Sequence, residues 1–191
     1  MGERLPAFQA FIDDLRKIWA KEPNLEACMR AGQARMRELV MNDALLEASK
    51  SWPSTEGQNL FLYEDPDHGF YINAVVRVPG RTGSVHDHAD AWVVYGVMDG
   101  TESLERFERT DDGSRPGHAE VRMTSVTQGK RGSVDIVGPW EIHAEQGGPA
   151  RSVAMILRSK KLVGEVLQNR FDLKTGKVTL GSGPEQVPFN I

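Results

Sequence analysis

Cysteine and long apolar runs are nearly absent from this chain of 191 residues. Cys28 is its single cysteine, which excludes an internal disulfide and is typical of a reducing compartment. No run approaches the roughly 18 apolar residues of a membrane span. The start, MGERLPAFQAF, lacks the basic and apolar regions of a signal peptide. We therefore expect a soluble, cytoplasmic protein that does not act at a membrane.

Clustered positive charge is also missing. The 23 basic residues stand against 27 acidic ones, the formal charge is −4, and no basic run exceeds a pair such as Lys160–Lys161. This pattern excludes the basic surface that nucleic-acid binding requires. With 39% hydrophobic residues the chain can bury one real core. We expect a monomer or homodimer whose partner is a small molecule.

The first part of the chain has helical periodicity. Apolar residues recur at helical spacing after Pro6, charged residues lie between them, and Pro23 ends this first helix. Asn24 can cap a second helix, whose apolar stripe includes Cys28. We expect residues 1–52 to form a helical segment packed on a barrel, with Cys28 as a buried thiol rather than a reactive one.

From about residue 60 the period becomes that of β-strands. Runs such as YINAVVRV, AWVVYGV and SVAMIL are separated by turn sequences such as VPGRTG and KTG. Six or more short antiparallel strands at this spacing favour a closed barrel or jelly roll over a parallel sheet. We expect residues 53–191 to form an all-β barrel that makes, with residues 1–52, a single structural domain.

A pattern of glycine and histidine stands out in the stretch GRTGSVHDHADAWVVYGVMDG. Its members Gly80, His86, His88 and Gly100 have the intervals of the first motif of the cupin superfamily, except that Val93 replaces the usual glutamate. The resemblance covers about residues 60–181. It implies an antiparallel cupin barrel, a jelly roll, preceded by N-terminal α-helices.

A third histidine completes a possible metal site. The later sequence GPWEIH, which ends in His143, resembles a degenerate second cupin motif. Residues i and i+2 of a strand face the same way, so His86 and His88 both point into the barrel and a facing strand supplies His143. Three neutral imidazoles leave the opposite side of a divalent ion open, which is typical of catalytic sites. The alternative is three structural histidines without a metal.

Within the cupins the chain resembles the cysteine dioxygenase-type thiol dioxygenases. The triplet at residues 86–88, the missing glutamate, the two helices and the hairpin-like FDLKTGKV carry this resemblance. It implies an iron(II) ion on three histidines, a thiol bound to the metal, and addition of both atoms of O₂ to sulfur to give a sulfinate. Zinc, nickel or copper are the alternatives that the ligand type allows.

Several positions depart from that family. Val93 stands where the animal-type enzymes have the cysteine of a cysteine–tyrosine crosslink, so this crosslink is not available. The serine–histidine–tyrosine relay should fall within Ser152–Arg158, where only the serine is present. The family's carboxylate-binding arginine, or glutamine in its mercaptopropionate enzymes, should fall near Gln58–Tyr63, where QNLFLY offers no arginine. We expect Val93 to line a substrate pocket, and the substrate stays open.

Arg77 is the candidate replacement for the missing arginine. The strand alternation that points Asn73 and Val75 inward also points Arg77 inward. An arginine buried near a dication needs an anion, so Arg77 would hold a substrate carboxylate through its planar fork. In the alternative interpretation Arg77 lies on the outer face and pairs with a nearby acid.

Three aromatic residues lie close to the histidines in the sequence. Trp92 and Tyr95 follow His88, and Trp140 lies three residues before His143. They either wall a substrate pocket or pack in the core. The Tyr95 hydroxyl needs a partner if it is buried, and it is our candidate to donate to an oxygen at the metal or beside a ligating histidine.

Three functions are compatible with these residues. The first is a non-haem iron dioxygenase whose partners are O₂ and a small thiol that carries a carboxylate. The second is a cupin oxygenase or lyase acting on an O,O-chelating substrate such as a dicarbonyl. The third is a metal-binding or small-molecule-binding cupin without turnover, which the missing relay residues would fit.

Overall fold

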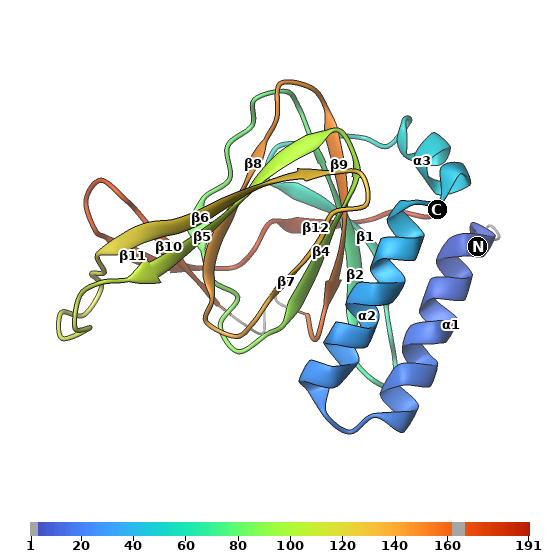
Figure 1. The fold of residues 1–191 in the computed structure, drawn as a ribbon, viewed down its shortest axis with the longest axis horizontal. Coiled ribbons are helices and arrows are strands. Elements are labelled where there is room, and N and C mark those ends of the chain that lie inside the picture. Colours follow the sequence, from blue (N-terminus) through green and yellow to red (C-terminus); the bar gives the residue numbers. More distant parts are fainter. Residues whose placement is uncertain (1–3, 162–166) are drawn as a thin grey trace.

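The computed structural model describes residues 4–161 and 167–191 (Figure 1). Its helices come first: α1 (Pro6–Lys21), α2 (Leu25–Val40) and α3 (Asp43–Ser49). The predicted cap of α2 is confirmed, because the Asn24 side chain accepts a hydrogen bond of 3.0 Å from the Ala27 N–H. The third helix was not predicted. None of the helices in these ranges is long and apolar enough to cross a membrane.

Twelve strands follow within the described residues. They are β1 (Gln58–Glu64), β2 (Tyr71–Arg77), β3 (Val85–His86), β4 (Val93–Asp99), β5 (Thr101–Arg109), β6 (Val121–Lys130), β7 (Val134–Val137), β8 (Ile142–Gly147), β9 (Ser152–Arg158), β10 (Gln168–Phe171), β11 (Val178–Gly181) and β12 (Glu185–Pro188).

The strands form two six-stranded sheets. Sheet A has the order β12-β1-β2-β9-β4-β7, and sheet B has the order β11-β10-β3-β8-β5-β6. Strands β2 to β9 pair as β2·β9, β3·β8, β4·β7 and β5·β6, all antiparallel. This is the pairing of one long hairpin wound into a barrel, so the predicted antiparallel jelly roll is confirmed. The parallel pair β1·β12 is the exception to the antiparallel pattern.

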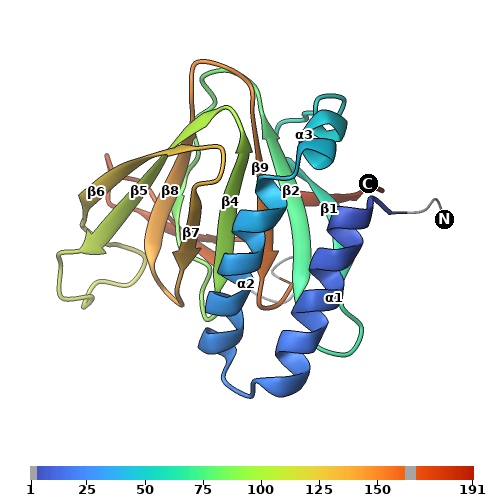
Figure 2. The same ribbon diagram turned by 45° about the vertical axis from the view of Figure 1, so that its right-hand side comes forward.

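Helices α1 and α2 lie side by side across the outer face of sheet A (Figure 2). Phe8 and Met29 from the helices and Ile72 and Leu157 from the strands belong to one buried apolar cluster. The approach is close at Gly96 of β4, where a Cβ would lie 2.7 Å from the Met36 side chain of α2. The helices therefore bury the outer face of the sheet and leave its other face to the barrel interior.

The interior of the barrel is only partly apolar. Val75, Tyr95, Val97 and Leu104 belong to a second buried cluster, to which both sheets contribute. Strand alternation places buried polar side chains on the same inner face of sheet A. They are Asn73, Arg77, Ser152 and Arg158.

Two strands differ from the prediction. Strand β6, with the sequence VRMTSVTQGK, was not among the runs singled out in the sequence, because it has few apolar residues and most of its residues are exposed. It is held by pairing with β5. Strand β3 is only two residues long, so His88 lies beyond the end of the strand that was expected to carry both histidines.

The turn after β4 fits the glycine pattern, because Gly100 has φ +71° and a Cβ there would lie 2.4 Å from the Arg151 carbonyl oxygen.

Candidate metal centre

Three histidines converge inside the barrel. His86 of β3 is the direct cross-strand partner of His143 of β8, and His88 follows β3. Their ring centroids are 4.5–4.7 Å apart, and one ring nitrogen of each lies within 4.8 Å of those of the others. His88 and His143 are buried, with 2% and 0% of their surface exposed. The structure thus brings together the three histidines that the sequence singled out.

Backbone carbonyls orient two of the rings. His86 Nδ1 lies 2.9 Å from the Ser84 carbonyl oxygen, and His143 Nδ1 lies 3.1 Å from the Glu141 carbonyl oxygen. A carbonyl oxygen only accepts, so each Nδ1 carries the hydrogen and each Nε2 keeps its lone pair. This is the arrangement by which proteins orient histidine ligands towards a metal.

The side chain of Gln168 orients the third ring, that of His88. The atom of the Gln168 side-chain amide that lies 2.6 Å from His88 Nδ1 is assigned as the nitrogen Nε2. The two ends of an amide can be assigned either way round, and with the oxygen facing Nδ1 the hydrogen is again on Nδ1. His88 Nε2 is then free to bind a metal, as are the Nε2 atoms of His86 and His143.

The electrostatics of the cluster favour neutral rings. Burial lowers the pKa of His86 to about 4, and burial together with the charge of Arg158 lowers the pKa of His88 well below its ordinary value. Neutral imidazole is the form that binds metals. His143 Nε2 is buried without a hydrogen-bond partner among the described residues, a costly arrangement unless another group satisfies it. The donor set, its tautomers and this nitrogen fit a divalent transition-metal ion.

The loops beside the histidines are tied to each other. Ala89, next to His88, and Trp140, three residues before His143, both have positive φ, at 49° and 61°. The Trp140 N–H donates to the Ala89 carbonyl oxygen at 2.6 Å. This contact joins the segment that carries His88 to the segment that leads into His143, and it fixes their separation.

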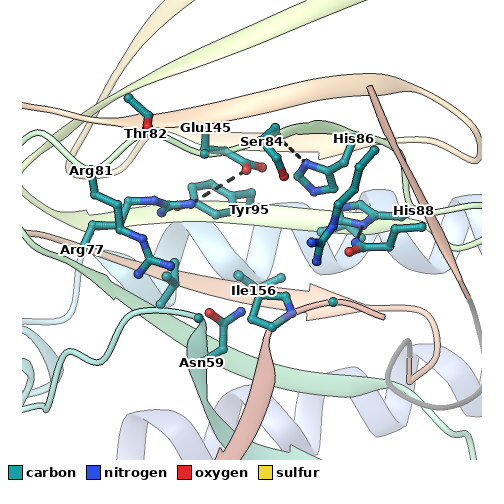
Figure 3. Close-up of a pocket in the computed structure, with 18 of the residues that line it drawn as sticks. Asn59, Arg77, Arg81, Thr82, Ser84, His86, His88, Tyr95, Glu145 and Ile156 are labelled. Atoms are coloured by element: carbon teal, nitrogen blue, oxygen red, sulfur yellow. Dashed lines mark hydrogen bonds and ion pairs between the residues drawn. The ribbon is translucent and has the colours of Figure 1, made fainter. Parts of the chain in front are cut away.

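A cavity of about 350 Å³ opens beside the cluster. His86 and His88 lie at one end of it and Arg77 and Arg81 at the other, with Glu145 between them (Figure 3). Val93, Tyr95 and Ile156 form part of its wall. An ion on the histidines would therefore face a small polar chamber.

Arg77 lines this cavity and also has an acidic partner. Its guanidinium donates to the Glu102 carboxylate at 3.0 Å and to the Tyr95 hydroxyl, and it lies 3.8 Å from Glu145. Burial lowers the pKa of Arg77, but the groups around it outweigh burial and raise the pKa above its ordinary value. Arg77 thus points inward, so the alternative that placed it on the outer face is wrong, although the acidic partner expected in that alternative is present in Glu102.

The Tyr95 hydroxyl is held in the same network. It donates to Glu102 at 2.5 Å, and the Ser152 hydroxyl donates to the other carboxylate oxygen of Glu102 at 2.6 Å. Burial raises the pKa of Tyr95 well above its ordinary value, so the phenol stays protonated. Its ring faces the cavity while its hydroxyl is directed at Glu102 rather than at the histidines.

The two tryptophans do not line the cavity, which corrects the expectation that they would wall a substrate pocket. Trp92 precedes Val93 and, by alternation, faces the other way, where it packs against the cluster beneath the helices. Trp140 is 59% exposed, and its positive φ turns it out of the barrel. Val93 does line the cavity, on the inner side of β4.

No family model matches the chain, and no curated protein matches it. Similar solved structures include an uncharacterized conserved protein with a double-stranded β-helix domain from Klebsiella pneumoniae, at 14% identity over 72% of this chain and 88% of that one, with a TM-score of 0.44. An oxalate oxidase in complex with glycolate has 18% identity over 51% of this chain and 50% of that one, with a TM-score of 0.39. The Schizosaccharomyces pombe Cnp3 cupin domain has 11% identity over 53% and 59%, with a TM-score of 0.42.

Because these scores lie below 0.5, the assignment of the fold rests on the strand order of this chain. Strands β2 to β9 form two four-stranded halves, ordered 2-9-4-7 and 3-8-5-6, around three inward histidines. The fold is that of a cupin. The cupin barrel thus presents a histidine cluster that fits a metal ion to an internal cavity.

Two residues that the sequence argument missed now belong to the site. Arg158 lines the cavity at the end of β9, and one of its guanidinium nitrogens is buried without a hydrogen-bond partner in the described part of the chain. Burial lowers its pKa to about 10. Glu145 lies two residues after His143. The alternation of side chains along a strand indicates that both residues face the barrel interior, because Arg158 shares a face with Ser152 and Glu145 shares a face with His143.

Proposed function

We propose that this protein is a non-haem iron dioxygenase that adds O₂ to the sulfur of a small thiol carrying a carboxylate. One observation supports it above the others: His86, His88 and the incompletely bonded guanidinium of Arg158 line the same small cavity. Iron(II), when bound, would supply the redox chemistry and the open coordination positions. The sulfur supplies the electrons that O₂ takes up, both oxygen atoms end on sulfur, and no further reductant is needed.

The charges of the cavity support an anionic substrate. Its lining includes four arginines, Arg77, Arg81, Arg158 and Arg170, and two glutamates, Glu56 and Glu145. Arg77 already has Glu102 at 3.0 Å. Arg158 has no acidic partner within ion-pair distance among the described residues and leaves a buried N–H group unsatisfied. Such a group gains most from a ligand that brings its own negative charge.

Each remaining residue has a role that the cavity suggests. Arg158 would bind the carboxylate, and the apolar side chains of Val93 and Ile156 would exclude water beside the thiol. Tyr95 and Ser152 hold Glu102, which in turn holds Arg77. They would keep the far end of the chamber rigid. We place the activity in the cytoplasm, where small thiols stay reduced.

The first experiment is metal analysis of protein purified without a histidine tag, followed by oxygen uptake by the iron-loaded protein. Thiols with a carboxylate, 3-mercaptopropionate and cysteine, are compared with ethanethiol and cysteamine, which lack one. We expect uptake with the first pair, a product heavier by two oxygen atoms, and loss of both metal and activity in His143→Ala. Zinc, nickel or copper in place of iron, or equal rates with both pairs, would contradict the proposal.

A second candidate function is an oxygenase or lyase acting on an O,O-chelating substrate. The observation that favours it is Glu145, whose carboxylate lies 3.3 Å from His143. A carboxylate among the ligands suits harder ions and oxygen-donor substrates. A diketone or hydroxy acid that is consumed while thiols are not would favour this candidate. Stoichiometric metal with neither reaction would favour a binding protein without turnover.

A further inference from the structure

Glu145 is a buried acid that neither histidine motif accounts for. It lies on β8, faces Leu104 of β5 across the strand pair, and is 8% exposed. Because it is two residues after His143, both side chains point into the barrel. Figure 3 shows its carboxylate between Arg77 and Tyr95 on one side and His86 on the other.

The contact between Glu145 and His143 needs a positive charge between the two groups. Glu145 Oε1 lies 3.3 Å from His143 Nε2, yet this nitrogen makes no hydrogen bond with any described residue. His143 Nδ1 already faces the Glu141 carbonyl oxygen, so Nε2 presents a lone pair. A lone pair and a carboxylate oxygen repel each other unless a cation, either a proton on Nε2 or a metal ion, is shared between them. A metal ion satisfies both at once.

The separation also suits two ligands of one ion. Nitrogen and oxygen ligands lie about 2.1 Å from a transition-metal ion, so two of them at right angles are roughly 3 Å apart. The 3.3 Å between Glu145 Oε1 and His143 Nε2 is close to this value. The other carboxylate oxygen, Oε2, lies 3.8 Å from the Arg77 guanidinium, which Glu102 holds at 3.0 Å. Ligating carboxylates are commonly oriented by such a partner.

We propose that Glu145 is the fourth metal ligand, with Arg77 as its positioning residue. It would supply from β8 the carboxylate that the cupin pattern lacks at Val93. The inference rests on the metal centre that both candidate functions share, and not on thiol oxidation. With three imidazoles and one carboxylate, a six-coordinate ion keeps two open positions and one positive charge, rather than three positions and two charges.

The test uses cobalt(II) as a spectroscopic probe in the full chain. Glu145→Gln keeps the size of the side chain and removes its charge. The control is Glu105→Gln on the neighbouring strand β5, where Glu105 faces Ala144 and accepts a hydrogen bond from Gln146 at 3.0 Å. We expect Glu145→Gln to raise the Kd for cobalt at least 10-fold and to change its visible absorption spectrum, while Glu105→Gln changes neither.

Four results would overturn the inference. Equal affinity and an equal spectrum in Glu145→Gln and the control would remove Glu145 from the site. Weaker binding with an unchanged spectrum would place the carboxylate near the ion but not on it. Wild-type protein that binds no cobalt, or His143→Ala that binds it in full, would refute the metal centre itself. Absence of thiol oxidation together with the expected spectral change would refute only the proposed reaction. Circular dichroism checks that each variant is folded.

Discussion

In the central strands β2 and β9 of sheet A both faces are buried, but the two faces have opposite chemistry. Every residue of β2 and of β9 is buried. On the outer face, alternate residues such as Ile72, Met155 and Leu157 pack beneath the helices. On the inner face, the same strands bury Asn73, Arg77 and Arg158.

The outer face stabilises the fold, whereas the inner face holds the polar and charged side chains that the fold positions. Apolar burial on the outer face is favourable by about 25 cal/mol per Å². Buried charges on the inner face cost desolvation energy, which paired and hydrogen-bonded partners offset only in part. We infer that the helices let the inner face carry groups that would otherwise weaken a small barrel.

The largest expected effect is on the inner face, at Arg77. Arg77→Met leaves Glu102 as a buried carboxylate without its cation, and breaking such a pair costs about 3–5 kcal/mol. We expect this loss in the free energy of unfolding, measured by urea denaturation. The double variant Arg77→Met with Glu102→Leu removes both charges and should recover most of it. A double variant as unstable as the single one would mean that the ion pair is not the cause.

A smaller loss is expected on the outer face. Leu157→Ala empties a fully buried site beneath α2 and should cost about 3 kcal/mol, within the range for leucine in a core. Because Leu157 points away from the cavity, the metal content of the folded protein should equal that of the wild type. A metal content that falls with stability would show that the two faces are coupled.

Asp65 is a buried charged residue that contacts helix α1, so it tests how much a charge on the helix side of the sheet contributes to stability. Its buried carboxylate accepts from the Asp67 and His68 N–H groups, the Tyr63 hydroxyl and Arg16 of α1. Burial raises the pKa of Asp65, but these hydrogen bonds outweigh it and hold the pKa below its usual value. The stabilisation is therefore present above about pH 4 and is lost as the pH falls through the lowered pKa.

We expect Asp65→Asn to cost about 1–3 kcal/mol at pH 7 and to flatten the acid limb of the stability curve. Unfolding measured at several pH values between neutral and acid gives both quantities. An unchanged acid limb in the variant would mean that other carboxylates dominate it.

The smallest effect on stability is expected at Arg158. Its guanidinium is buried and incompletely bonded, so Arg158→Met should leave Tm unchanged or raise it. The same change should weaken binding of a carboxylate ligand, measured by calorimetry with 3-mercaptopropionate on the metal-loaded protein. Arg170→Met, at an exposed residue of the cavity lining, is the matched control. A marked fall in Tm would mean that Arg158 supports the fold.

The sequence predicted the barrel and the histidine cluster because both depend on local patterns. Glycines at turn positions and the spacing of His86 and His88 can be read along the chain. The sequence of β6 is a weaker signal, because most of its residues face solvent and it is held by pairing with β5. The prediction that Trp140 lines a substrate pocket was wrong. Its positive φ, which the sequence does not reveal for tryptophan, turns the side chain outward.

The second half of the site depended on pairing between distant strands. Arg77 could be placed inward from parity, but its partner Glu102 comes from another strand and could not be identified. Parity also points Arg158 and Glu145 inward, but parity does not say which inward polar residues belong to the site. Their burial, and the partners they lack or share, become visible only when β8 and β9 lie beside their neighbours.

The wound hairpin has a kinetic consequence. Only β5 and β6, the two strands at its bend, are close in sequence, whereas His86 and His143 meet through the pair β3·β8. Closing such distant pairs is slow, so the ligands should assemble late on the folding pathway. A bound ion would then slow unfolding far more than it accelerates refolding, which stopped-flow measurements with and without cobalt can test. Metal loading would make this barrel long-lived rather than quick to form.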